Sequence, residues 1–173
     1  ASSTQAWTTT IRLTNGVSLD SLYVPASSNG FTVSSPVYAY PNVTVSITGT
    51  GKAANLANLI KAITFKSVSE NPSITARSIT IEINDGTCSG NGNSTISITR
   101  VNDNPVLDLD NNDNSGKIGA DYQTTYTEKG SDKNIADTDI TITDVDNTTL
   151  NSATVTLTNN LDGIATENIS LTT

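Results

Sequence analysis

The chain has 173 residues, of which 35% are hydrophobic and 5% are aromatic, and its formal net charge at pH 7 is −8. It contains no His, which excludes imidazole general bases and His-ligated zinc or iron sites. The longest apolar runs are far shorter than the roughly 20 residues of a membrane-spanning helix, so we expect no membrane insertion.

The acidic residues are concentrated in the second part of the chain. Residues 1–101 carry six Lys or Arg and four Asp or Glu, whereas residues 102–173 carry three Lys or Arg and thirteen Asp or Glu. Such a surface repels the phosphates of nucleic acids and anionic lipids. Nucleic acid and membrane surfaces are therefore poor partner candidates, and a divalent cation is the natural one.

Segments in which Val, Ile and Thr alternate with polar residues predict β-strands throughout the chain. In chain order they are residues 8–14, 42–49, 62–68, 77–85, 94–101, 139–145 and 153–159. Each has one aliphatic and one hydroxyl face, which is typical of antiparallel sheets packed on one side. The pattern predicts an all-β protein with a β-sandwich architecture.

One stretch departs from this alternation. Residues 52–62 (KAANLANLIKA) are rich in Ala and Leu, and the segment places Leu56, Leu59, Ile60 and Ile63 at helical spacing. They predict a short helix that caps the sandwich of the first domain.

The chain also repeats itself. Residues 9–15 (TTIRLTN) match residues 153–159 (ATVTLTN) at an offset of 144, and residues 20–24 (DSLYV) match residues 167–171 (ENISL) a few positions out of register. The sequence therefore covers slightly more than one repeat. We expect residues 1–101 to close one repeat unit, residues 102–104 to form a linker, and residues 105–173 to open the next unit.

Several segments resemble cadherin-like domains of large prokaryotic surface proteins. SITIEINDGT and STISITRVNDNPVL resemble the final strands and linker of such a domain, and LIKAITFKSVSENPS resembles the helix, strand and turn before them. Residues 121–171, from DYQTTYTEKG to ENISL, look like the opening half of the next domain. The resemblance implies a seven-stranded Greek-key sandwich on the cell surface or outside the cell, with Ca²⁺ bound where two domains meet.

The resemblance also implies a set of ligands. The linker NDN, the pair in DVDN, the aspartate of NDG and the early glutamate of YTEKG correspond to Asn102, Asp103, Asn104, Asp144, Asp146, Asp85 and Glu128. In cadherins the early glutamate faces the far end of its domain, so Glu128 would serve a different interface. The chain lacks the LDRE motif of vertebrate cadherins, which implies fewer carboxylates per site.

The residues themselves suit Ca²⁺. This ion prefers six to eight oxygen ligands, and short Asp or Asn side chains at alternate positions of an extended chain can converge on one cation. NDN, DVDN and DTD have this form, and DTD adds Asp137 and Asp139 as candidates. Carboxylates gathered without a cation repel one another, so ion binding and ordering should be coupled.

A second arrangement of acidic residues remains open. DNNDNSGKIGAD places Asp110, Asn112, Asn114 and Asp121 at positions 1, 3, 5 and 12 of an EF-hand loop, and Asp108 precedes it. Gly falls at position seven instead of six, the last ligand is Asp instead of Glu, and no helices are predicted beside it. A solvated turn rich in Asp and Asn is the competing interpretation.

Other features point weakly to function. N-glycosylation sequons begin at Asn42, Asn93, Asn147 and Asn168 and matter only in a host that glycosylates. Cys88 is expected to be a free or intermolecular thiol, because no His is present to activate it. The pair Asp162 and Glu167 lacks an aromatic-lined cleft of the kind that holds a sugar for hydrolysis. No catalytic residues are predicted, and we expect the chain not to be an enzyme.

Two functional hypotheses follow. The first is a Ca²⁺-binding structural or adhesive module of an extracellular adhesin, fibre or surface layer, in which neighbouring repeats, or copies of the chain joined head to tail, complete one another's sheets in a filament. The second is a carbohydrate-binding module of a large secreted protein, which requires an exposed aromatic platform around Trp7 or around Tyr38 and Tyr40.

Overall fold

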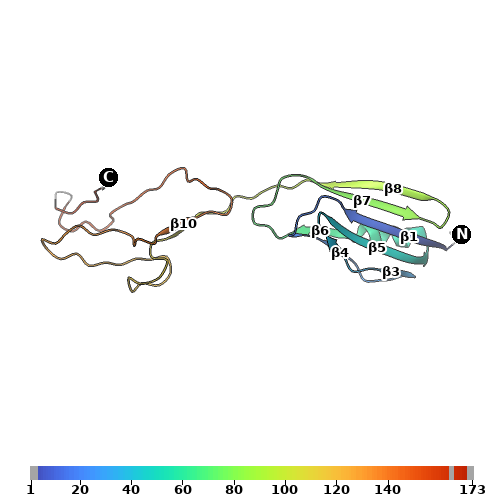
Figure 1. Ribbon diagram of the computed structural model, residues 1–173, viewed down its shortest axis with the longest axis horizontal. Coiled ribbons are helices and arrows are strands. Elements are labelled where there is room, and N and C mark those ends of the chain that lie inside the picture. Colours follow the sequence, from blue (N-terminus) through green and yellow to red (C-terminus); the bar gives the residue numbers. More distant parts are fainter. Residues whose placement is uncertain (1–3, 164–165, 171–173) are drawn as a thin grey trace. The chain divides into compact units, whose positions relative to one another are not determined.

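The computed structural model describes residues 4–163 and 166–170 and divides into two compact units, Ala1–Asp103 (unit 1) and Asn104–Thr173 (unit 2) (Figure 1). The division falls inside the expected linker, residues 102–104. Within the part of the chain that is described, no helix has the length and apolar character needed to cross a membrane.

Unit 1 is built from antiparallel β-strands and one short helix, which confirms the predicted all-β class. A large sheet has the strand order β3-β5-β1-β7-β8, with β4 also paired to β5, and β2 pairs with β6 in a second, two-stranded sheet. The Greek-key connection stays a prediction. The elements are β1 (Gln5–Leu13), β2 (Asp20–Tyr23), β3 (Phe31–Val33), β4 (Val37–Ala39), β5 (Asn42–Gly51), α1 (Ala53–Lys61), β6 (Thr64–Ser67), β7 (Arg77–Asn84) and β8 (Ser89–Ile96).

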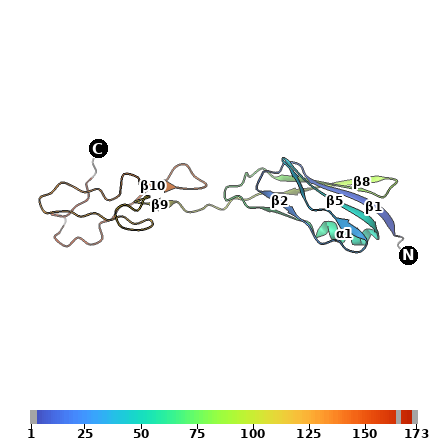
Figure 2. The same ribbon diagram turned by 60° about the horizontal axis from the view of Figure 1, so that its bottom comes forward.

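The core of unit 1 lies between the large sheet and a layer made of β2, β6 and α1. Alternate residues of β1 and β5 point inward, and the helix buries the two leucines that its spacing predicted. Figure 2 shows α1 and β2 on one side of the large sheet. The buried apolar residues are Ile11, Leu13, Leu22, Phe31, Val43, Val45, Ile47, Leu56, Leu59 and Ile79.

A buried ion pair ties the two layers together. Arg77, the first residue of β7, donates from Nε to Oδ2 of Asp20 in β2 at 2.6 Å, and the two side chains are 1% and 0% exposed. The N–H of Val17 donates to the same oxygen at 3.0 Å. Burial by itself raises the pKa of Asp20, but the hydrogen bonds from Arg77, Val17 and Ser67 and the charge of Arg77 outweigh burial and leave that pKa below its ordinary value.

Two predicted strands are corrected by the structure. The segment predicted at 94–101 forms its strand earlier, at Ser89–Ile96, because a tight turn at residues 85–88 starts the β7–β8 hairpin and pairs Ser89 with Asn84. The Gly- and Asn-rich residues after Cys88 therefore belong to β8. Residues 153–159 form no strand, because the described part of the chain offers no neighbouring strand to pair with them.

Unit 2 contains little regular structure in its described residues. Its strands β9 (Val106–Asp108) and β10 (Thr141–Thr143) pair antiparallel, with Leu107 opposite Ile142. Asp110 is its only buried residue among those described, while its Val, Leu and Ile side chains are largely exposed. The unit therefore has no apolar core of its own in the described structure, and its order depends on polar contacts.

The ion pair makes the stability of unit 1 depend on Asp20. Asp20→Asn leaves the guanidinium of Arg77 buried without a counter-charge, so we expect the free energy of unfolding to fall by about 3–5 kcal/mol. Urea denaturation followed by fluorescence measures this, because the single Trp of the chain, Trp7, packs against the core of unit 1. In chelator, Glu128→Gln is the control and should leave the transition unchanged, since Glu128 and its partner Lys129 are each 88% exposed.

The same pair gives a pH dependence with a defined sign. Because the pKa of Asp20 is lower in the folded chain, its contribution is complete above the unfolded value of about 3.9 and is lost as the pH falls through the folded value. The Asp20→Asn variant should lack this part of the acid destabilisation. An equal loss of stability in both proteins between pH 5 and pH 2 (roughly the range over which a carboxylate titrates) would contradict the assignment.

Candidate metal centre

Three carboxylates meet in unit 2. Asp110, Asp137 and Asp139 each offer one carboxylate oxygen, and these oxygens all lie within 4.8 Å of one another. Asp110 is fully buried, and the other two are half-buried. We call these three residues the Asp cluster.

Asp110 is fixed by the loop that follows β9. Its Oδ2 accepts the backbone N–H of Ser115 at 2.8 Å, and its Oδ1 accepts that of Asn114 at 3.2 Å. Asp113 supports the tight turn with a φ of 56°, a left-handed conformation that Asp tolerates better than most residues. The side-chain hydrogen bond from Ser115 is the largest influence on the pKa of Asp110, and with the backbone donors it outweighs burial and lowers that pKa.

The other two members arrive on the segment that leads into β10. The N–H of Asp137 donates to the carbonyl of Leu109 at 2.8 Å, and Thr141 pairs with Asp108 across the β9–β10 ladder. This register brings the DTD segment beside the loop of Asp110. The cluster is therefore positioned by the same short ladder that forms the only regular structure of unit 2 in its described part.

The carboxylate of Asp139 is the member that local hydrogen bonding does not explain. Asp110 has two backbone donors, and Oδ1 of Asp137 accepts from the N–H and hydroxyl of Thr138 at 2.6 and 3.3 Å. Oδ1 of Asp139 is buried and has no hydrogen-bond donor among the described residues. A buried, unpaired carboxylate oxygen next to two further carboxylates is an unfavourable arrangement without a cation.

The donor set fits Ca²⁺. All three ligands are hard oxygens, and three carboxylates can supply up to six of the six to eight oxygens that Ca²⁺ takes, with carbonyls or water supplying the rest. Zinc and copper sites favour His and Cys, which the cluster lacks. At about 4 Å, two unit charges repel by about 1 kcal/mol in water and about 4 kcal/mol near a protein surface, and a divalent cation would remove this repulsion.

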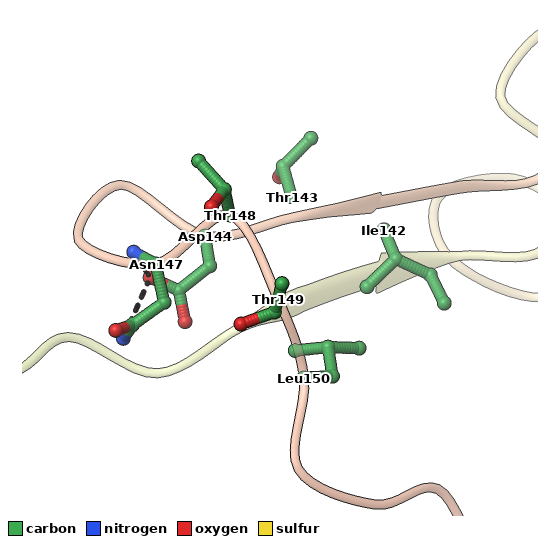
Figure 3. A pocket seen from close by; sticks show the side chains of 7 residues that line it. All are labelled: Ile142, Thr143, Asp144, Asn147, Thr148, Thr149 and Leu150. Atoms are coloured by element: carbon green, nitrogen blue, oxygen red, sulfur yellow. Dashed lines mark hydrogen bonds between the residues drawn. The ribbon is translucent and has the colours of Figure 1, made fainter.

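The predicted DVDN site is separate from the Asp cluster. Oδ1 of Asp144 accepts the N–H groups of Asp146 and Asn147, both at 2.8 Å, so Asp144 closes a turn after β10. These backbone donors lower the pKa of Asp144. Figure 3 shows Asp144 and Asn147 at one end of an open pocket of about 210 Å³, with Leu150 at the other. Hydrogen bonds account for Asp144 without an ion.

The linker residues and Asp85 are not brought together. Asp85 closes the β7–β8 turn, where its Oδ1 accepts the N–H of Cys88 at 2.8 Å, and these hydrogen bonds lower its pKa. The eight residues of β7 span about 26 Å, and residue 102 follows β8 beyond the end of the hairpin that is opposite the turn of Asp85. The side chain of Asn102 donates to the carbonyl of Asp103 at 2.7 Å, and Asn104 is exposed.

The loop with EF-hand spacing contributes one ligand to the cluster. Only Asp110 of that set belongs to it; Asp121 is exposed, and Asn112 accepts the N–H of Asn114 at 3.0 Å. Asp108 accepts the N–H of Asp110 at 3.1 Å.

The sequence pattern placed Asp110 and the DTD pair in two different candidate sites. The missed signal was VLDLD as a short strand, whose pairing with residues 141–143 joins the two.

The remaining candidates lie on separate surfaces. Trp7 is half-buried and donates from its indole N–H to the carbonyl of Gly51 at 3.2 Å, while Tyr38 and Tyr40 are exposed with ring centroids 6.1 Å apart. Cys88 is an exposed free thiol. Oε2 of Glu167 accepts the backbone N–H groups of Leu161 and Asp162. Of the sequon residues, Asn42 is half-buried, and Asn93, Asn147 and Asn168 are exposed.

Comparisons with models of protein families, with curated proteins and with solved structures find no match to this chain. The cadherin-like resemblance therefore stays a prediction, and the argument for function rests on the geometry of the Asp cluster.

The members of the cluster should differ in the absence of metal. In chelator, Asp110→Ala removes the acceptor of the Ser115 N–H, so we expect that amide to exchange with solvent much faster, whereas the Asn114 amide keeps the side chain of Asn112 as an acceptor. Asp137→Ala should leave the Ser115 amide unchanged, because Asp137 does not accept from it. Hydrogen exchange followed by NMR measures this, and equal protection in both variants would show that Asp110 does not hold the loop.

Proposed function

We propose that this protein is a Ca²⁺-binding structural module and that the Asp cluster of unit 2 holds the ion. The observation that carries the proposal is Oδ1 of Asp139, which is buried beside two carboxylates without a donor in the described structure. Ca²⁺ would supply the missing partner, and the other two members would complete a site of three carboxylates.

The position of the cluster supports a structural role. Its ligands come from two segments, residue 110 and residues 137–139, which flank the β9–β10 ladder. An ion bound there would cross-link the two segments and close the intervening stretch of chain. Because unit 2 has so few buried apolar groups, such a cross-link would be among its main stabilising interactions.

The location and the assembly are proposed on the resemblance to cadherin-like domains. Extracellular Ca²⁺-binding modules work at dissociation constants of about 10⁻⁴–10⁻³ M. A site of three carboxylates on a loosely held segment suits that range. We also propose a second ion at the junction of the repeats, held by Asn102, Asp103 and Asn104, and head-to-tail contact between repeats or copies of the chain.

The Asp cluster can be tested with one substitution. Calorimetric titration of the intact chain with CaCl₂ should show binding, and saturating Ca²⁺ at about 100 times the dissociation constant should stabilise unit 2 by about 2.7 kcal/mol. Asp139→Asn should weaken binding at least about tenfold. In chelator, the variant should be no less stable than the natural chain, because the substitution removes one of three mutually repelling charges.

Asp132→Asn is the matched control. It makes the same change of charge at an exposed position outside the cluster, and it should bind Ca²⁺ like the natural chain. Absence of Ca²⁺ binding by the natural chain would refute the proposal, as would equal affinity in the Asp139→Asn variant. Stronger binding of Mg²⁺ than of Ca²⁺ would show that the ion is misassigned.

A further inference from the structure

In unit 1, the turn after β1 is hydrogen-bonded to the beginning of β7. The side chain of Asn15 accepts the N–H of Ser78 at 2.8 Å and donates to the carbonyl of Ala76 at 2.9 Å, and the N–H of Thr14 donates to the carbonyl of Ser78 at 2.9 Å. Between these backbone contacts, Arg77 reaches Asp20. Residues 14–20 thus contact both the backbone at the start of β7 and the side chain of Arg77.

Unit 2 repeats this turn. Thr158 and Asn159 occupy the positions of Thr14 and Asn15 in the matching segments TTIRLTN and ATVTLTN. Two residues after Asn159, the N–H of Leu161 donates to Oε2 of Glu167 at 2.8 Å. In unit 1, the N–H of Val17, two residues after Asn15, donates to Oδ2 of Asp20 at 3.0 Å. Glu167 thus accepts the N–H at the position that corresponds to Val17, although it lies six residues after Leu161 whereas Asp20 lies three residues after Val17.

The strand that such a turn holds in unit 1 has no counterpart in the described part of unit 2. Asn159 makes no hydrogen bond to another described residue, and no described Lys or Arg forms an ion pair with Glu167. Val155 and Leu157 are 61% and 45% exposed. Their counterparts in β1, Ile11 and Leu13, are 2% and 0% exposed, because β1 is paired between β5 and β7 and its inward face is covered by the layer of β2, β6 and α1.

We propose that residues 153–162, together with Glu167, form the docking site for a partner strand of the β7 type, in which Arg is followed by Ser and then by alternating aliphatic residues. The partner's Arg pairs with Glu167, and its backbone pairs antiparallel with residues 153–159. The side chain of Asn159 holds the backbone on either side of that Arg. Strand addition through main-chain hydrogen bonds is an established mode of recognition. Residues 153–159, which form no strand in the described structure, pair only when the partner strand docks, and the Arg sets the register.

The charge and the fixed position of Glu167 favour this occupant over an unspecific apolar segment. Glu167 is half-buried and its carboxylate is already fixed by two backbone N–H groups, so it is preorganised to receive a guanidinium. The docking site contains none of the three residues of the Asp cluster, so Ca²⁺ binding and peptide binding can fail separately.

The test uses the intact chain and a fluorescein-labelled peptide with the sequence of residues 75–84 (TARSITIEIN), followed by fluorescence anisotropy in Ca²⁺ and in chelator. Saturable binding is expected in both conditions. The R77Q peptide should bind at least about tenfold more weakly, the loss expected for a charge-assisted hydrogen bond. Glu167→Gln in the chain should weaken the natural peptide equally and abolish the difference between the two peptides.

Three outcomes would overturn the proposal. The first is no binding of the natural peptide. The second is binding that survives both Glu167→Gln and Leu157→Asp, which would place the peptide in unit 1. The third is a chain that does not bind the peptide but self-associates in sedimentation, with self-association abolished by Leu157→Asp. That result would mean that a second copy covers this surface with a different segment. Because the R77Q comparison uses the natural chain, it stays decisive even if Glu167→Gln alters the turn.

Discussion

An extended segment of chain keeps its shape only when its backbone N–H and C=O groups have partners. In unit 1 this condition is met for β1 on both edges, since β5 and β7 pair along most of its length. Its inward residues are buried, because the paired sheet also packs against β2, β6 and α1. In unit 2 nearly the same sequence pattern at residues 153–159 has no flanking strand among the described residues, and its aliphatic side chains are exposed. The contrast between the units comes from pairing, because the two segments are alike in propensity.

The two units also treat buried carboxylates differently. Asp20 is buried against Arg77, so its charge is matched by a side chain of the same unit. Asp110 is buried equally, but its described neighbours are two further aspartates and backbone N–H groups. In the first arrangement the negative charge is balanced by a protein group. The second has a surplus of negative charge, which is the physical reason for looking to a cation from solution.

The sequence predicted what depends on local periodicity and missed what depends on pairing between distant segments. The alternation in β1, β5 and β7 and the spacing of Leu56 and Leu59 were sufficient to place those strands and α1. The strands β2, β3, β4 and β9 are only three or four residues long, too short to show a period. For the same reason Asp110 and Asp139 were assigned to different sites: their proximity is set by the register of β9 with β10, which no local pattern reports.

The outer edge of the large sheet has a consequence for solubility. Strand β8 ends the described strand order and is exposed along nearly its whole length, through Ser89, Gly90, Asn91, Gly92 and Asn93. Many proteins blunt such an edge with Lys or Pro. In β8 the composition protects the edge. Its small, polar side chains offer little apolar surface to a second sheet, so the dry, interdigitated stacking of amyloid-like fibrils would bury little apolar area there.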